Sequence, residues 1–215
     1  MDRTPPRQEG EVLRPDLLFI VEAVPEGARV LDLGCGTGEL LKMLADRKGT
    51  LGTGIEIVEE RVYAAAAHGV TVHHGDFTEV LPYYPDASFD YVILSQTLQQ
   101  ANETLTVLNE ALRVGRHVVA SFPNFGHWRA RFQLMLGGRV PVTDALPYQW
   151  YDTPNVRSLT VKDFRVFARE QGVGIVRSFF TGERKRVWLW PNLRAVDALF
   201  ILERVPSAAD SRAVK

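Results

Sequence analysis

Cysteine, long apolar runs and an excess of charge of either sign are all scarce in this chain of 215 residues. The one cysteine, Cys35, excludes a disulfide within the chain, so we expect an intracellular, cytoplasmic protein. No apolar run approaches the roughly 20 residues of a membrane-spanning helix, and the N-terminus lacks the apolar segment of a signal peptide. A formal net charge of −1 gives no electrostatic reason to expect a nucleic acid or a membrane as partner.

Apolar residues, by contrast, are ample. They make up 46% of the chain, which is enough for a single hydrophobic core. We expect one domain over residues 14–204, preceded by a loose N-terminal end, 1–13, and followed by a loose tail, 205–215.

Strand and helix patterns alternate along this domain, which predicts an α/β fold with a largely parallel sheet. The predicted strands are Val30–Leu33, a run ending at Glu56, Val70–His74, Phe89–Leu94, His117–Phe122, Val173–Phe180 and Ala198–Leu202. Helical patterns begin near Arg14, Glu39, Val58, Asn102, Trp128 and Thr160, where Asn102 and Thr160 are expected to cap their helices.

A glycine-rich turn follows the first predicted strand, with Asp32, Gly34, Gly36 and Gly38 at alternate positions. Glycine accepts a positive φ and allows a ligand to approach the backbone closely. A dinucleotide-binding fingerprint would need glycine or alanine at position 39, where this chain has Glu39. An acid just before the turn suits a cation better than a pyrophosphate. The turn resembles the first motif of class I S-adenosylmethionine-dependent methyltransferases; an ordinary strand-to-helix turn is the alternative.

Further acids follow the next two strands. Glu56 lies 22 residues after Gly34, close to the ~20 expected of an acid that accepts hydrogen bonds from a ribose. Both oxygens of a carboxylate accept, so it can hold two vicinal hydroxyls; a solvated acid at a strand end is the alternative. In the resembled superfamily an acid after the third strand holds the adenine amino group beside an apolar residue, which Asp76 and Phe77 match.

The expected ligand-binding residues all lie at or just after predicted strand ends. They are Asp32, Gly34, Cys35, Gly36, Gly38, Glu56, Ile57, Asp76, Phe77, Ser95 and Gln96. Cys35 could be a nucleophile, but we prefer the interpretation of a small residue that fits the turn. We expect no metal site, because the adjacent histidines His73 and His74 would point to opposite faces of a strand.

The segment after the fourth strand offers no catalytic group. Ser95–Gln100 lacks the Asn/Asp-Pro-Pro run with which enzymes methylate amino groups of bases or glutamine. Gln100 stands where many small-molecule methyltransferases have a histidine, and a glutamine amide cannot act as a general base. Methyl transfer can proceed by alignment alone if the nucleophile is already neutral. We therefore assign no catalytic residue.

Two later segments have a candidate role in recognition. Residues 139–159 lack a helix or strand pattern but are rich in aromatic residues, so we expect a lid or docking surface above the carboxyl ends of the strands. The cluster Arg184–Arg186 is a weak indication of nucleic-acid binding. We prefer a solvated turn followed by a packed strand that contains Trp188 and Trp190.

Several runs together resemble the MetW proteins of methionine biosynthesis, over roughly residues 14–204. The runs are Leu31–Gly36, Leu94–Gln99, Phe122–Trp128, Pro141–Thr143 and Trp150–Asn155. One departure is Arg157, where we would expect a histidine.

This resemblance implies a doubly wound, mostly parallel, seven-stranded sheet whose last strand is antiparallel. It implies S-adenosylmethionine or S-adenosylhomocysteine as ligand, and homoserine O-acyltransferase as protein partner. The implied role is an accessory or regulatory subunit of that acyltransferase. An active methyltransferase acting on a small molecule is the alternative, and nucleic-acid modification is a third. The acyl donor of the partner, a homodimer and the contacts with the partner stay open.

Overall fold

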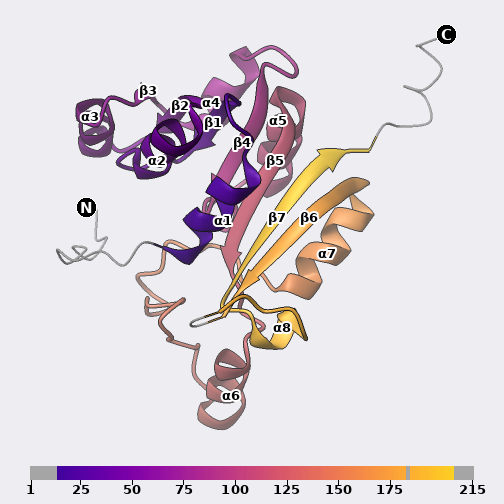
Figure 1. Cartoon of the computed structure of the whole chain (residues 1–215). Coiled ribbons are helices and arrows are strands. Elements are labelled where there is room, and N and C mark those ends of the chain that lie inside the picture. Colours follow the sequence, from indigo (N-terminus) through magenta and orange to yellow (C-terminus); the bar gives the residue numbers. More distant parts are fainter. Residues whose placement is uncertain (1–13, 183–184, 206–215) are drawn as a thin grey trace.

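The computed structural model describes residues 14–182 and 185–205 (Figure 1). In this part of the chain seven strands form one sheet in the order β3-β2-β1-β4-β5-β7-β6. Their bounds are β1 Arg29–Leu33, β2 Leu51–Glu56, β3 Thr71–His74, β4 Phe89–Ser95, β5 Gly115–Pro123, β6 Val173–Thr181 and β7 Asp197–Arg204. Only β7 is antiparallel to its two neighbours, β5 and β6. The predicted α/β fold with an antiparallel last strand is thus confirmed.

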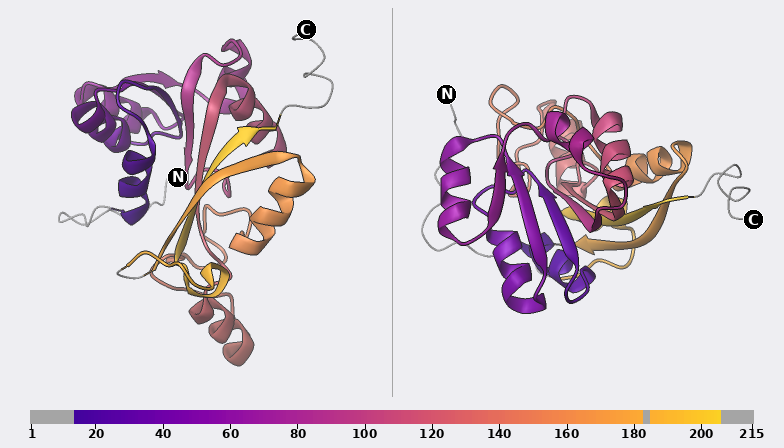
Figure 2. Two further views of the ribbon diagram at one scale, coloured as in Figure 1. Left: turned by 45° about the vertical axis from the view of Figure 1, so that its right-hand side comes forward. Right: turned by 90° about the horizontal axis from the view of Figure 1, so that it is seen from above.

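Helices cover both faces of the sheet (Figures 1 and 2). Their bounds are α1 Pro15–Ala23, α2 Glu39–Lys48, α3 Glu59–Ala67, α4 Phe77–Val80, α5 Thr104–Val114, α6 Trp128–Gly137, α7 Val161–Glu170 and α8 Pro191–Arg194, with a 3-10 turn at Leu81–Tyr83. Among the described residues, no helix has the length and apolar character needed to cross a membrane.

Alternation along the strands divides the core into two clusters. Leu31 and Leu33 of β1 point to the face covered by α5 and α7, while Val30, the residue before Leu31, points to the face covered by α1 and α2. Strands β4, β5 and β7 alternate in the same way, so apolar side chains occupy both faces of the central strands. A sheet that is buried on both faces is typical of a doubly wound α/β protein.

Three local expectations were wrong or incomplete. Asn102 does not cap α5; the helix begins at Thr104, because Asn102 lies in a turn whose carbonyl accepts from the Arg157 side chain at 2.6 Å. The short helix α4 was not predicted, since its four residues are too few for a helical pattern. Trp188 and Trp190 are exposed outside any strand, because the chain there turns into α8.

The sheet topology decides where functional groups can gather. Strands β1 to β5 run in the same direction, and the chain reverses its strand order between β1 and β4. Ligands of doubly wound proteins bind at such a switch point, outside the carboxyl ends of the strands. Because β7 is antiparallel, its first residue, Asp197, lies at this same edge, opposite Pro123 of β5 and Thr181 of β6.

Candidate ligand-binding cleft

A cleft with a volume of about 1220 Å³ opens at the carboxyl ends of the strands. Ten of the eleven residues expected to bind a ligand line it, from Asp32 on β1 to Gln96 after β4. The exception is Gly38, the N-cap of α2, which has a φ of +78°. A Cβ at this position would lie 2.9 Å from Val70 and 3.1 Å from Ala65, so Gly38 is on the packed side of the turn. The sequence motif therefore combines residues that face the cleft with one that shapes the turn.

The glycine turn is fixed by the backbone of β2. The N–H groups of Gly34 and Cys35 both donate to the carbonyl of Ile55, at 2.8 and 3.1 Å. Gly34 and Gly36 have φ values of +77° and +57°, which favour glycine. A Cβ on Gly36 would meet nothing within 4 Å, so the backbone there is open to the cleft.

Cys35 packs inward, against β2. An added Cβ on Gly54 would lie only 2.3 Å from the Cys35 sulfur, so the thiol needs the glycine opposite it. Burial, together with the charges of Asp32 and Glu56, raises the pKa of the Cys35 thiol to about 12. A protonated thiol is a poor nucleophile, and this supports a packing role for Cys35.

Glu56 is buried at the end of β2 and braces the glycine turn. Its Oε2 accepts from the Gly36 N–H at 2.8 Å, and its Oε1 accepts from the N–H groups of Ile57 and Val58 at 3.0 and 2.9 Å. A carboxylate has about four acceptor positions, so one position on Oε2 remains. That position suits a single hydroxyl, rather than two hydroxyls held by both oxygens.

Asp32 lines the cleft and, like Asp16, has only 2% of its surface exposed. Its Oδ1 is buried and has no hydrogen-bond partner among the described residues. Burial raises the pKa of this carboxyl to about 7; nearby Arg14 lowers it in part, and Glu56 raises it further. An unpartnered carboxyl oxygen is costly to bury, and a cation or a hydrogen-bond donor in the cleft would relieve that cost.

Asp76 and Phe77 lie at the end of β3, on the far side of the glycine turn. The Oδ1 of Asp76 accepts from the N–H and the hydroxyl of Thr78 at 2.8 and 2.7 Å, and so caps α4. No described contact uses its Oδ2. Phe77 is half-buried against the core and also lines the cleft. This pair offers an acceptor beside an aromatic ring.

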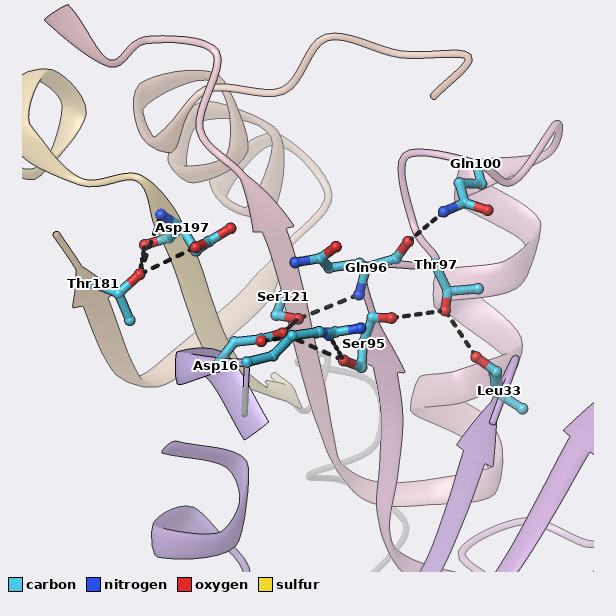
Figure 3. Close-up of polar contacts among 10 residues, drawn as sticks. Asp16, Leu33, Ser95, Gln96, Thr97, Gln100, Ser121, Thr181 and Asp197 are labelled. Carbon is cyan, nitrogen blue, oxygen red and sulfur yellow. Dashed lines mark hydrogen bonds and ion pairs between the residues drawn. The ribbon is translucent and has the colours of Figure 1, made fainter. Parts of the chain in front are cut away.

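Ser95 and Gln96 belong to a polar cluster at the ends of β4 and β5 (Figure 3). Gln96 has a positive φ of +55°, and its N–H donates to the carbonyl of Ser121 at 3.0 Å. Its carbonyl accepts from the Gln100 amide at 3.0 Å. Gln100 is thereby used to hold the turn after β4.

Sequence reasoning missed two cleft residues that α1 supplies. Arg14 donates from Nη2 to Asp16 Oδ2 and to Ser95 Oγ, each at 2.6 Å. Ser121 donates to Asp16 Oδ2 at 3.0 Å, and Figure 3 shows these two side chains together. Burial alone would lower the pKa of Arg14, but the hydrogen bond and charge of Asp16 outweigh it and raise that pKa. Because Asp16 lies 105 residues from Ser121, no local sequence pattern could reveal this contact.

A further acid, Asp197, was also missed. It lines the cleft at the start of β7, where the Thr181 hydroxyl donates to its Oδ2 at 3.3 Å. Burial and the charge of Asp16 raise the pKa of Asp197 to about 7. With Asp16, Asp32 and Glu56, it makes one end of the cleft rich in carboxyl groups.

His127 is a further residue of the cleft that sequence reasoning did not assign. It is 8% exposed, immediately precedes α6 and lines the cleft. The neighbouring Asn124 donates from Nδ2 to the carbonyl of Ala195 at 2.8 Å, which ties the end of β5 to the start of β7. His127 stands in the run Phe122–Trp128 that carries the family resemblance, and this was the sequence evidence that could have identified it.

The segment 139–159 forms one wall of the cleft and, apart from a bridge between Thr143 and Leu146, has no helix or strand. Thr143–Tyr148, Pro154 and Asn155 line the cleft. The N–H groups of Val156 and Arg157 both donate to the Gln99 carbonyl, at 3.0 and 3.1 Å. The Arg157 guanidinium binds the carbonyls of Ala101 and Asn102. Arg157 therefore holds this wall against the turn after β4.

Of the expected basic cluster, Arg184 lies outside the described residues. Arg186 is held by neighbours: its guanidinium lies 4.7 and 4.6 Å from the ring centroids of Phe19 and Phe179, and 3.3 Å from Glu22. These contacts show that the Arg186 side chain packs against its neighbours at the edge of the sheet.

Solved structures share this architecture over most of the chain. A methyltransferase dependent on S-adenosylmethionine from Archaeoglobus fulgidus superposes with a TM-score of 0.66 at 16% identity, covering 88% of this chain and 91% of that one. One from Thermotoga maritima gives a TM-score of 0.65 at 16% identity and covers 88% and 87%. At such identity the likeness defines the fold alone. The protein thus has the fold of the class I methyltransferases.

Sequence comparison identifies the family to which the chain belongs within this fold class. Residues 14–202 match the family described as methionine biosynthesis protein MetW, and the chain belongs to that family. A curated relative, the "Bifunctional methionine biosynthesis protein MetXA/MetW" of Rhodopirellula baltica, is 38% identical over an alignment of 205 residues that covers 89% of this chain and 33% of that protein. A demethylmenaquinone methyltransferase of Listeria welshimeri is 34% identical over an alignment of 134 residues that covers 55% of this chain and 56% of that protein. The chain thus spans about a third and about half of these relatives.

Proposed function

We propose that this protein binds S-adenosylmethionine in the cleft and acts with homoserine O-acyltransferase as an accessory or regulatory subunit in methionine biosynthesis. The observation that carries the ligand assignment is Asp32, a cleft residue whose buried Oδ1 has no hydrogen-bond partner among the described residues. A ligand with a sulfonium and an ammonium would place positive charge near this acid-rich end, where burial strengthens electrostatic attraction. The same site would bind S-adenosylhomocysteine through its adenosyl part.

The residues around the glycine turn fit such a ligand. Glu56 has one acceptor position left for a ribose hydroxyl. The Oδ2 of Asp76, which no described contact uses, could accept from an adenine amino group, with Phe77 next in the cleft lining. Gly36 leaves the backbone uncovered between them. When bound, S-adenosylmethionine supplies an electrophilic methyl group. The chain's own contribution is to bind the charged end, orient the adenosyl end and cover the cleft with segment 139–159, which we propose as a lid within a single domain, 14–204.

The accessory role is supported by the fused relative. The Rhodopirellula protein carries both a MetXA and a MetW name, and this chain corresponds to a third of it. Two functions that occur in one chain in one organism commonly act together as separate subunits in another. We therefore propose the homoserine O-acyltransferase as the partner in the cytoplasm, without a need for methyl transfer.

Two measurements test the proposal. Titration calorimetry of the purified protein with S-adenosylmethionine should show saturable binding, while adenosine diphosphate should not compete. Acyltransferase activity should then be measured with and without this chain; we expect the chain to change the rate. An unchanged rate at saturating chain would exclude the accessory role but leave ligand binding intact.

One observation favours the alternative, an active methyltransferase with a small-molecule substrate. The cleft volume of about 1220 Å³ exceeds the roughly 300–1,000 Å³ common for one drug-sized ligand, and His127 at its wall could accept a proton from an attacking nucleophile. Transfer of a labelled methyl group to a metabolite extract, lost in His127→Asn, would support this activity. If no methyl group is transferred to any compound of a broad panel, the methyltransferase alternative is refuted and the proposed ligand-binding role is unaffected.

A further inference from the structure

Helix α6 presents apolar side chains that the rest of the described chain leaves uncovered. Of its ten residues only Ala130 is buried, and Figures 1 and 2 show the helix projecting from the body of the molecule. Trp128, Phe132 and Leu136 follow one another at a spacing of four residues, so they form one stripe along the helix. Their exposed fractions are 43%, 50% and 76%, and the neighbouring Met135 is 70% exposed.

A groove joins this helix to a second exposed apolar segment. Trp128 lines a depression of about 510 Å³ together with Trp188 and Leu189, which are 77% and 69% exposed. We call the stripe on α6 and these two residues the α6 face. Tryptophan, methionine and arginine are enriched in protein interfaces, and an exposed apolar patch bordered by polar residues commonly marks one.

The segments that carry the α6 face have an excess of basic residues, although Glu22 of α1 offsets the charge of Arg186 at 3.3 Å. Residues 127–143 and 185–196 contain no aspartate or glutamate, and their basic residues are Arg129, Arg131, Arg139, Lys185, Arg186 and Arg194. A contact that pairs this face with itself in a second copy would bring like charges together, which is unfavourable. The face instead fits an apolar helix or loop of another protein with acidic residues around it.

We propose that the α6 face is the docking surface for the homoserine O-acyltransferase; this inference rests on the function proposed above. The fused relative makes that acyltransferase the protein for which an interface is expected. The face is also continuous with the ligand site, because His127 and Gly182 line both the groove and the cleft. A partner seated in the groove would therefore sense whether the cleft holds a ligand, through residues common to both sites.

The test compares a double variant with a matched control. Leu136→Glu and Trp188→Ala change two exposed side chains of the α6 face, whereas Tyr83→Ala changes an aromatic residue that is 88% exposed outside it. Binding to the purified homoserine O-acyltransferase of the same organism should be measured by titration calorimetry or sedimentation. We expect the double variant to bind at least about tenfold more weakly, since interface tryptophans often dominate affinity, and the control to bind as the wild type does.

The possible outcomes separate this inference from the function on which it rests. Wild-type affinity in the double variant would overturn the docking surface and leave the accessory role standing. No binding by the wild-type chain would overturn both. S-adenosylmethionine affinity, measured on each variant, should be unchanged and reports that the fold is intact. Three measurements on the wild-type chain test other occupants of the α6 face: homodimer formation in sedimentation, binding to phosphatidylglycerol vesicles, and retention on RNA at physiological salt. If the wild-type chain shows one of these interactions and the double variant loses it, the proposal is overturned.

Discussion

At Asp32 a carboxyl group is almost fully buried next to a single partly neutralising cation, Arg14. The folded protein keeps a proton on this group up to about pH 7, while the unfolded chain loses it near 3.8. Folding therefore takes up a proton between these values, and stability falls as pH rises through the window from about 4 to 7. Asp197 has a pKa raised to about 7 and acts in the same direction.

The first prediction follows from this linkage. Asp32→Asn removes the group that must lose its proton, so the variant should gain stability relative to the wild type at pH 8, on the order of 1–3 kcal/mol, and gain little at pH 4. Denaturant unfolding at both pH values measures the difference. Asp46→Asn, an exposed acid on α2, is the control and should leave the profile unchanged. A gain of equal size at both pH values would show that ionisation of Asp32 is not its cause.

The second prediction concerns the acids that would hold the adenosyl part of the ligand. Glu56→Ala and Asp76→Ala each remove an acceptor in the cleft and should weaken S-adenosylmethionine binding by about 1–3 kcal/mol. Glu56→Ala should have the larger effect, because it also releases the N–H groups of Gly36, Ile57 and Val58. Calorimetry on both variants, with exposed Glu60→Ala as the control, checks this order. Unchanged affinity in both would refute the site.

At the scale of the element, α1 connects the N-terminal side of the domain to the cleft. Arg14 at its N-terminal boundary and Asp16 in its first turn bind hydroxyls from β4 and β5, and the apolar face of α1 packs against α2, β6 and β7. Asp16 has only 3% of its side chain exposed, and Arg14 is its ion-pair partner at 2.6 Å.

The third prediction separates this buried pair from a surface pair. Arg14→Ala leaves Asp16 buried without its cation and should lower the free energy of unfolding by roughly 2–3 kcal/mol. This loss is smaller than the roughly 3–5 kcal/mol expected when a fully buried ion pair is broken, because the Arg14 side chain is 30% exposed. Lys42→Ala breaks the exposed pair with Asp46 on α2 and should cost under about 0.5 kcal/mol. Equal costs in denaturant unfolding would mean that Arg14 contributes as a surface charge only.

Elements also show how far sequence reasoning extends. Most strands could be predicted because they are short runs of apolar or alternating residues, as in β4, β5 and β7. Asp32 and Glu56 could be found from the glycine motif and its spacing, and Asp76 from the resemblance to the methyltransferases. Asp197 was missed because it begins a strand, and only the antiparallel direction of β7 brings it to the cleft edge of the sheet. Long-range contacts such as Asp16 with Ser121 depend on how α1 packs, which no local pattern records.

At the scale of the whole molecule, two sites share residues. The cleft at the switch point and the groove beside α6 both include His127 and Gly182, and segment 139–159 runs from the end of α6 along the cleft wall. An arrangement of this kind allows a ligand and a protein partner to influence one another through differences in affinity between two states of the chain.

The fourth prediction concerns this coupling. If S-adenosylmethionine changes the dissociation constant of the complex with the acyltransferase by some factor, the acyltransferase must change the dissociation constant of S-adenosylmethionine by the same factor, because binding linkage is reciprocal. We expect a factor of about 5–150, the usual range for allosteric coupling. Two titrations measure it: acyltransferase into the chain with and without ligand, and ligand into the chain with and without acyltransferase. A coupling factor of one in both titrations would mean that the chain binds the acyltransferase equally well with and without S-adenosylmethionine. If the factor exceeds one and His127 carries the coupling, His127→Asn should reduce it.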